Sequence, residues 1–288
     1  MLLLKPDLQS MIEISSPLKI KSHLADLKKE GKKVGFVPTM GALHQGHLAL
    51  IKRAKSENDI VVCSIFVNPL QFNRKEDLEK YPNRLKEDSE MLNKVGCDLL
   101  FTPQKEELYA EQPKTDFNFG SIAVGMEAEY RPGHFEGVAA VIERFLSILS
   151  PDKAYFGEKD FQQLAIVRWV KEQFNFDTEV VGCQTVRDEN GLAMSSRNYL
   201  LEESQYLIAS EIYKLMKYCQ TKVGETAPQV LAKECFEKLK PNFKPEYFEI
   251  VDGLTLQPIK SWEESNQPRV FVAAYLGSVR LIDNLSLV

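Results

Sequence analysis

A short apolar run, an amphipathic segment and a second apolar run follow one another near the start of the chain, and this pattern restricts the fold most. The runs are VGFVPT (34–39) and DIVVCSIFV (59–67), rich in β-branched and aromatic residues. Such runs are typical of parallel strands buried on both faces. Between them, HLALIKRAKSEN (47–58) places Leu48 and Ile51 at helical spacing. The pattern predicts a right-handed strand–helix–strand unit.

The same alternation continues toward the middle of the chain. Helices are expected at 83–95, 137–149 and 161–174, and strands at 97–103, 153–157 and 178–186. Later segments change order to two helices and then three strands, at 202–222, 226–239, 247–253, 269–277 and 279–288. This arrangement predicts an α/β protein, with a doubly wound parallel-sheet domain over residues 1–184 and a smaller α+β domain over residues 185–288.

Charge and cysteine content exclude several classes of protein. A net charge of −5 and a pI of about 5.6 give no general attraction for nucleic acid or an anionic membrane, so we expect neither as a partner. No apolar stretch approaches the roughly 18 residues that a membrane span needs. The five cysteines, Cys63, Cys97, Cys183, Cys219 and Cys235, are far apart and lack C-x-x-C spacing. They favour buried free thiols in the cytoplasm over disulfides or a thiolate metal site.

The turn PTMGALHQGH (38–47) lies between the first strand and the first helix. Gly41 and Gly46 permit unusual backbone angles and a close approach to the main chain. The amides and dipole of the new helix favour an anion such as phosphate, and His44 and His47 can donate hydrogen bonds to it. A metal site is a weaker interpretation, because no acidic third ligand follows as in H-E-x-x-H. The third interpretation is an ordinary glycine turn with two surface histidines.

Two further turns carry polar residues. In SIFVNPLQF (64–72), Asn68 and Gln71 fall at the carboxyl end of a predicted parallel strand, where open α/β sheets bind ligands. In EYRPGHFEGV, Arg131 and His134 flank a Pro-Gly turn before a helix. A shared pocket for a polyanion or a carboxylate explains this placement, although Asn-Pro alone most often only makes a turn.

The segment YFGEKDFQQL places Lys159 at a strand end beside a helix start. Lys159 is either a solvated surface lysine or a point charge for phosphate. Asp160 is a good N-cap for the following helix, which would be a purely structural role, and Gln163, one turn in, could project to the same side.

In GLAMSSRNYL, two hydroxyls and a guanidinium follow a glycine turn. Ser195, Ser196 and Arg197 suit either a helix cap with a surface charge or a phosphate-clamping loop. No G-x-S-x-G, G-x-x-x-x-G-K-[ST] or G-x-G-x-x-G motif is present. A serine hydrolase, a P-loop NTPase and a standard dinucleotide fold are therefore not supported.

Taken together, PTMGALHQGH, FVNPLQF, RPGHFEGV, FGEKDFQQL and GLAMSSRN resemble the pantothenate synthetase (pantoate–β-alanine ligase) family of the HxGH nucleotidyl-transferase superfamily. The resemblance implies a Rossmann-like domain and a smaller C-terminal lid domain. It implies ATP and Mg²⁺, the substrates pantoate and β-alanine, and a homodimer. In this family pantoate carboxylate attacks the α-phosphorus of ATP, and β-alanine then displaces AMP from pantoyl adenylate.

The resemblance also assigns residues. The expected ATP-binding residues are Pro38, Met40, Gly41, Ala42, Leu43, His44, Gln45, Gly46, His47, Gly157, Glu158, Lys159, Asp160, Val186, Met194, Ser195, Ser196 and Arg197. Of these, the expected catalytic residues are His44, His47, Lys159 and Arg197, with His47 as the proton donor. The expected residues for pantoate and β-alanine are Asn68, Gln71, Arg131, His134 and Gln163. No metal ligands are assigned.

One departure and two rivals accompany this interpretation. The family usually reads Y-P-R-T where this chain has YPNR (81–84), so no role is assigned to Asn83 or Arg84. A nucleotidyl transferase acting on a phosphorylated substrate is the nearest rival, but two glutamines suit a hydroxylated carboxylate better. A silent nucleotide-binding module is the other, and the intact set of histidine, lysine and arginine residues disfavours it.

Overall fold

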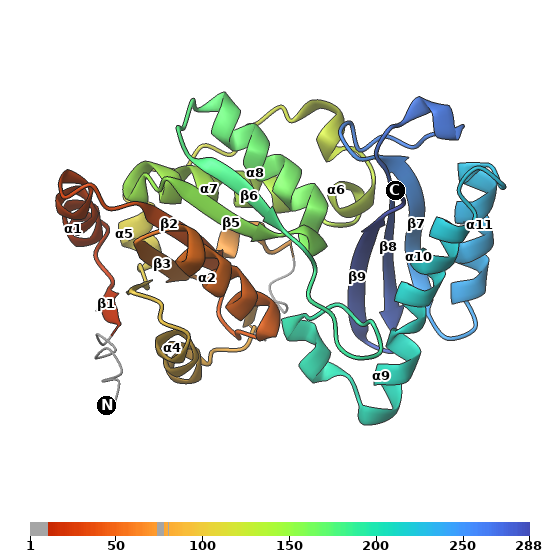
Figure 1. Cartoon of the computed structure of the whole chain (residues 1–288), viewed down its shortest axis with the longest axis horizontal. Helices are drawn as coiled ribbons and strands as arrows, with labels where there is room; N and C mark the ends of the chain where they lie inside the picture. The colour runs from red at the N-terminus through yellow and green to blue at the C-terminus, as the bar shows by residue number, and fades with distance from the viewer. Residues whose placement is uncertain (1–10, 74–77, 80) are drawn as a thin grey trace, which may run out of the picture.

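The structure, a computed structural model, describes residues 11–73, 78–79 and 81–288. Its larger part is a parallel sheet in the order β1-β4-β3-β2-β5-β6 (Figure 1). The strands are β1 (Ile12–Ile14), β2 (Val34–Thr39), β3 (Ile60–Ile65), β4 (Leu99–Phe101), β5 (Lys153–Gly157) and β6 (Glu179–Cys183). The helices are α1 (Pro17–Lys29), α2 (Gln45–Glu57), α4 (Leu85–Lys94), α5 (Lys105–Leu108), α6 (Met126–Tyr130), α7 (His134–Leu149) and α8 (Phe161–Gln173). The predicted doubly wound α/β class is confirmed.

Both faces of this sheet are buried, which explains why its strands read as continuous apolar runs. Phe36 packs with α1, α7 and α8 in the core on one face. Its neighbour Val37 packs with α2 and α4 on the other face. Successive side chains of a strand point to opposite faces, so each strand needs apolar residues at both its odd-numbered and its even-numbered positions.

The smaller part contains an antiparallel sheet of β7 (Lys244–Asp252), β8 (Pro268–Leu276) and β9 (Val279–Ser286). Its helices are α9 (Glu203–Ala209), α10 (Glu211–Thr221) and α11 (Pro228–Leu239). Helices α10 and α11 cover one face of this sheet (Figure 1). On the other face Tyr247, Val251 and Phe271 pack against Met126 of α6, which joins the two parts through an apolar cluster.

Several local features differ from the prediction. Strand β1 and helix α1 precede the first predicted strand; α1 begins with Pro17 and buries Ile20 and Leu24, an i, i+4 pair that could have predicted it. The helix predicted over 202–222 is divided at Ser210, whose hydroxyl donates to the carbonyl oxygen of Leu207 at 2.6 Å. Such a bond competes with the helical backbone pattern and bends helices. The five cysteines are buried, as predicted.

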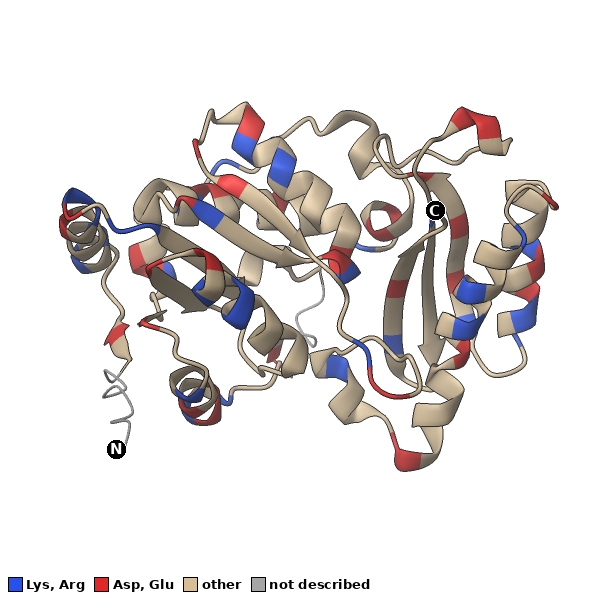
Figure 2. Cartoon of the chain, in the orientation of Figure 1, with Lys and Arg blue, Asp and Glu red and all other residues tan. Residues whose placement is uncertain are grey.

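Charged residues of both signs are interspersed over the two parts of the molecule (Figure 2). This distribution agrees with the small net charge of −5. Within residues 11–73, 78–79 and 81–288, no helix combines the length and the apolar character that crossing a membrane requires.

Candidate active site

The strand order reverses between β2 and β5, the point where open α/β sheets bind ligands at the carboxyl ends of their strands. The turn at 40–47 follows β2, and the short 3₁₀ helix η3 (Glu158–Asp160) follows β5. Two of the predicted nucleotide segments therefore meet at this position. Pro38 belongs to β2, Gln45 begins α2, and Gly157 ends β5.

The turn after β2 has two consecutive residues with positive φ, Gly41 at 84° and Ala42 at 50°. The left-handed conformation costs a non-glycine residue roughly 1–2 kcal/mol. The buried carboxylate of Asp88 on α4 offsets that cost, because it accepts the amide hydrogens of Ala42 and Leu43, each at 2.8 Å. Burial raises the pKa of Asp88, and these two amide bonds oppose the increase.

His44 and His47 cap the first turn of α2 reciprocally. The Nδ1 atom of His44 accepts the amide hydrogen of Gly46 at 3.1 Å, and the Nδ1 atom of His47 accepts that of His44 at 3.3 Å. A Cβ at Gly46 would lie 2.8 Å from the His44 ring, so the glycine is required. Burial lowers the pKa of His44 to about 4 and that of His47 to about 3, with Lys159 contributing to both.

Both rings are therefore neutral at pH 7 and carry their hydrogen on Nε2. The turn was predicted to offer backbone amides to an anion, yet those of Ala42, Leu43, His44 and Gly46 are already paired. These four amides are therefore not available to an anion, whereas the two rings, which cap the helix through Nδ1, can offer Nε2–H to one.

The Ser-Ser-Arg segment lies against this turn. The 3₁₀ helix η4 (Ser196–Leu200) begins there, and the Ser196 hydroxyl donates to the carbonyl oxygen of Ala42 at 3.1 Å. Ser195 caps η4 by accepting the amide hydrogen of Arg197 at 3.3 Å. The amide of Met194 donates to the carbonyl oxygen of Val186 at 2.9 Å. The structure thus brings together two segments about 150 residues apart.

Lys159 lies where two pockets adjoin. Its side chain is only 14% exposed, and its Nζ atom lies 3.6 Å from the carboxylate of Asp160. The Asn284 side chain of β9 donates to the carbonyl oxygens of Glu158 and Lys159, both at 2.8 Å, and thereby holds η3. Asp160 makes no side-chain cap on α8, contrary to the prediction.

The two pockets differ in lining. Lys159 borders both of them. The first pocket includes Ser195, Arg197, Asn198, Arg280 and Asp283. The second includes Glu127, Arg131, His134 and Gln163. Arg197, predicted to bind phosphate, and Arg131, predicted to bind a carboxylate, therefore line adjacent pockets.

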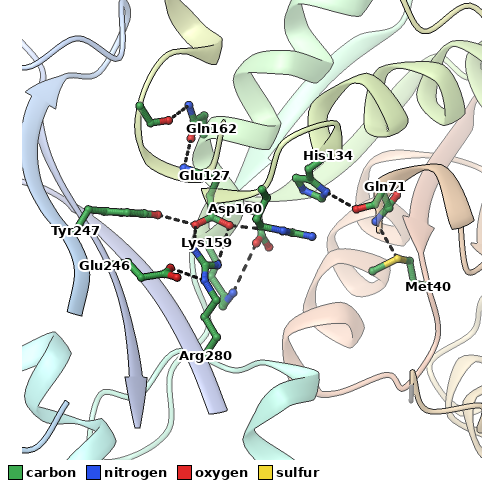
Figure 3. A network of polar contacts seen from close by, with 12 residues as sticks. Met40, Gln71, Glu127, His134, Lys159, Asp160, Gln162, Glu246, Tyr247 and Arg280 are labelled. Carbon is green, nitrogen blue, oxygen red and sulfur yellow. Dashed lines mark hydrogen bonds and ion pairs between the residues drawn. The ribbon is translucent and has the colours of Figure 1, made fainter. Parts of the chain in front are cut away.

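Gln71 is buried on the 3₁₀ helix η1 (Pro69–Gln71) and points toward Met40, with its Nε2 atom 2.9 Å from the sulfur (Figure 3). Its Oε1 atom accepts a hydrogen bond from Asn68, which also donates to the carbonyl oxygen of Gly137 at 2.9 Å. His134 contacts the Gln71 carbonyl oxygen at 2.9 Å, and burial lowers the pKa of His134 to about 3. Asn68 and His134, predicted to meet the ligand, thus hold Gln71 in place.

The carboxylate of Glu127 binds three side chains (Figure 3). Arg280 donates to it at 2.6 and 2.9 Å, the Tyr247 hydroxyl at 2.8 Å, and Arg131 lies 3.5 Å away. Burial raises the pKa of Glu127, but hydrogen bonds and charge from Arg280 lower it to about 2. Glu127 thereby connects the part of the molecule that contains the parallel sheet to β9. It also lies beside Arg131, which lines the second pocket.

The neighbouring glutamines have different surroundings. Buried Gln162 accepts the Glu127 amide hydrogen and donates to the carbonyl oxygen of Ile122, both at 3.0 Å. Gln163 lines the second pocket, and its role in binding a ligand stays a prediction. Asp88, Glu127 and Arg280 were not predicted, because nothing in their local sequence marks them.

In the described part of the chain, no group of three or more histidine, cysteine, aspartate or glutamate side chains is arranged to hold a metal ion. The fold and the site together define a doubly wound α/β protein with a cation-lined cleft at its topological switch point. Comparison with known proteins narrows this class further.

The family model described as pantoate-beta-alanine ligase matches residues 13–286. A pantothenate synthetase of Cytophaga hutchinsonii is 43% identical over 96% of this chain and 100% of its own length, and one of Phocaeicola vulgatus is 47% identical over 92% and 95%. The crystal structure of pantothenate synthetase from Thermus thermophilus superposes with a TM-score of 0.88 at 40% identity, covering 96% of this chain and 99% of that one. Pantoate-beta-alanine ligase from Francisella tularensis, complexed with beta-gamma ATP and β-alanine, has a TM-score of 0.80 at 36% identity, covering 96% and 98%. The chain belongs to the pantoate–β-alanine ligase family.

Proposed function

We propose that the chain condenses pantoate with β-alanine to pantothenate, through pantoyl adenylate, with release of AMP and pyrophosphate. The observation that carries this proposal is the hydrogen bond from Ser196 to Ala42, which joins the histidine turn to the Ser-Ser-Arg segment beside Lys159. The family membership of the chain supports the same reaction.

Adenylation requires no protein nucleophile. A pantoate carboxylate oxygen attacks the α-phosphorus, and the bond to the bridging oxygen of pyrophosphate breaks. Neutral His44 and His47 donate through Nε2, while Lys159 and Arg197 offset charge on the α-phosphate and on the leaving group. The β-alanine amine then attacks the acyl carbon, loses a proton and expels AMP.

The second pocket suits the carboxylic acid substrates. We assign pantoate to Gln71 and Gln163, whose amides offer donors and acceptors to hydroxyl and carboxylate groups. Arg131, which lines the second pocket together with Gln163, offers a guanidinium to a carboxylate there. Asn68 and His134 support Gln71 from behind.

A magnesium ion at this site would need few ligands from the protein. Mg²⁺ commonly binds one or two carboxylates together with substrate phosphates, and the Asp160 carboxylate, 47% exposed beside Lys159, can supply one. The ion would neutralise phosphate charge when it accompanies ATP. The nucleotide would otherwise contact the predicted segments, Pro38 to His47, Gly157 to Asp160, Val186 and Met194 to Arg197.

We further propose a cytoplasmic homodimer in which residues 185–288 close as a lid over a domain of residues 1–184. Shielding the adenylate from water gives such closure a purpose. The buried free cysteines agree with a reducing compartment.

The test uses the purified full chain with Mg²⁺. Incubation with ATP and pantoate should exchange labelled pyrophosphate into ATP, and added β-alanine should yield pantothenate and AMP in equal amounts. Absence of both reactions would falsify the proposal. Adenylyl transfer to a phosphorylated acceptor instead would identify another HxGH-type nucleotidyl transferase, and ATP binding without turnover would identify a silent nucleotide-binding module.

A further inference from the structure

The backbone of Ala42 is held from two directions by segments remote in sequence. Its amide hydrogen is accepted by Asp88 at 2.8 Å, from a residue 46 positions away. Its carbonyl oxygen accepts the hydroxyl hydrogen of Ser196 at 3.1 Å, from a residue 154 positions away. This one residue therefore connects α4, the histidine turn and η4.

Successive backbone amides in a turn can form a concave anion site, and here a side-chain carboxylate occupies it. Asp88 uses both of its oxygens, one for Ala42 and the other for Leu43. A Cβ at Gly41 would lie 3.0 Å from the same carboxylate and 3.2 Å from Ile65, so the turn closes tightly around Asp88. The carboxylate thus fixes the backbone immediately before His44.

We propose that Asp88 is a positioning residue of the ligase reaction. It holds Gly41 and Ala42 in their left-handed conformation and thereby fixes His44 and His47 with Nε2–H toward the nucleotide. It also prevents the amides of Ala42 and Leu43 from binding phosphate. The inference rests on the proposed function, because it assumes that this turn receives ATP.

The variant D88N keeps the shape of the side chain but replaces one acceptor oxygen with a donor, which opposes one of the two amides. We expect D88N to weaken ATP binding, measured by calorimetry, by about tenfold or more, with the KM for pantoate unchanged. The matched control is E87Q, at an exposed acidic residue one position earlier on α4, which should bind ATP like the wild type. A merely structural role would instead lower kcat through loss of folded protein and leave the ATP affinity unchanged.

A second variant separates the two explanations. Glycine adopts positive φ readily, so A42G in the D88N background should recover most of the lost ATP affinity. Unchanged ATP affinity in D88N, or no recovery in D88N/A42G, overturns the inference. Should D88N not fold, hydrogen exchange of the ligand-free wild type decides: slow exchange at the Ala42 and Leu43 amides supports the role, and exchange at the rate of an open loop overturns it.

Failure of the proposed function is distinguishable from failure of this inference. A wild-type protein that neither binds ATP nor forms pantothenate would contradict both the proposed function and the role of Asp88. If the wild-type protein forms pantothenate and the D88N variant binds ATP with the same affinity, only the role of Asp88 is contradicted.

Discussion

Ser196 donates its hydroxyl hydrogen to the carbonyl oxygen of Ala42 at 3.1 Å, although 154 residues separate them. This bond joins the only Ser-Ser-Arg segment of the sequence to the turn that carries His44 and His47. The bond is made between protein groups alone, and it places the two segments to which we assign ATP in direct contact. Preorganisation of this kind lowers the cost of ordering a loop on binding.

The S196A variant tests that contact. Loss of one neutral hydrogen bond is worth about 1 kcal/mol, so the KM for ATP should rise about fivefold with the fold intact. Steady-state kinetics at saturating pantoate measure this change. The control is S204A on α9, where the serine is exposed; an S196A enzyme with the same KM for ATP as S204A contradicts the contact's role.

Lys159 should contribute to the chemical step more than to folding. Its largely buried ammonium borders both pockets, and removal of a group that stabilises transition-state charge costs about 10²–10³ in rate. K159Q should therefore slow pyrophosphate exchange by that factor. K171Q, which removes a lysine paired to Glu172 on α8, is the matched control. Near-normal exchange in K159Q would exclude Lys159 from the reaction.

The strand–turn–helix order could be predicted because it depends on neighbouring residues. Phe36 and Val37 both read as apolar, and Gly41 precedes a helix, so strand and turn are visible locally. The long-range hydrogen bonds and ion pairs that hold the site in place could not be predicted in this way. Asp88 finds its amides 46 and 45 positions away, and Glu127 finds Arg280 153 positions away. The hydrogen bonds by which Asn68 and His134 hold Gln71 were not predicted either, because sequence alone does not reveal which polar groups are paired internally.

Acid should destabilise the protein from about pH 6.5 downward. The pKa values of His44, His47 and His134 lie at about 4, 3 and 3 in the folded protein, against about 6.5 unfolded. The unfolded state therefore binds more protons between these values, so stability is complete above pH 6.5 and falls as the pH decreases. Each histidine contributes at most about 1.4 kcal/mol per pH unit.

The measurement is urea unfolding at pH 7, 6 and 5, with H134N as the comparison, since an Asn amide can still donate to Gln71. The free energy of unfolding of H134N should fall less steeply than that of the wild type. Equal slopes would show that His134 is not buried in its neutral form.

The ion pair of Glu127 with Arg280 should dominate the connection between the two parts of the molecule. Removing one partner of a buried pair leaves the other charge unpaired and costs about 3–5 kcal/mol. E127A should lower the free energy of unfolding by that amount, and E127M/R280M should lose much less. E234A, which breaks the exposed pair with Lys238, should change little. A small loss in E127A would contradict the importance of the pair.

Gly137 on α7 controls the position of Gln71. A Cβ at this residue would lie 2.3 Å from the carbonyl oxygen of Leu70 and 2.5 Å from the amide nitrogen of Gln71, so η1 must move in G137A. Overpacking of this kind costs about 1–3 kcal/mol of stability. Because we assign Gln71 to pantoate, the KM for pantoate should rise about tenfold or more. ATP affinity serves as the internal control, since the capping bonds of His44 and His47 lie within α2 and its own N-terminal turn. A G137A enzyme with wild-type KM for pantoate would mean that Gln71 does not contact this substrate.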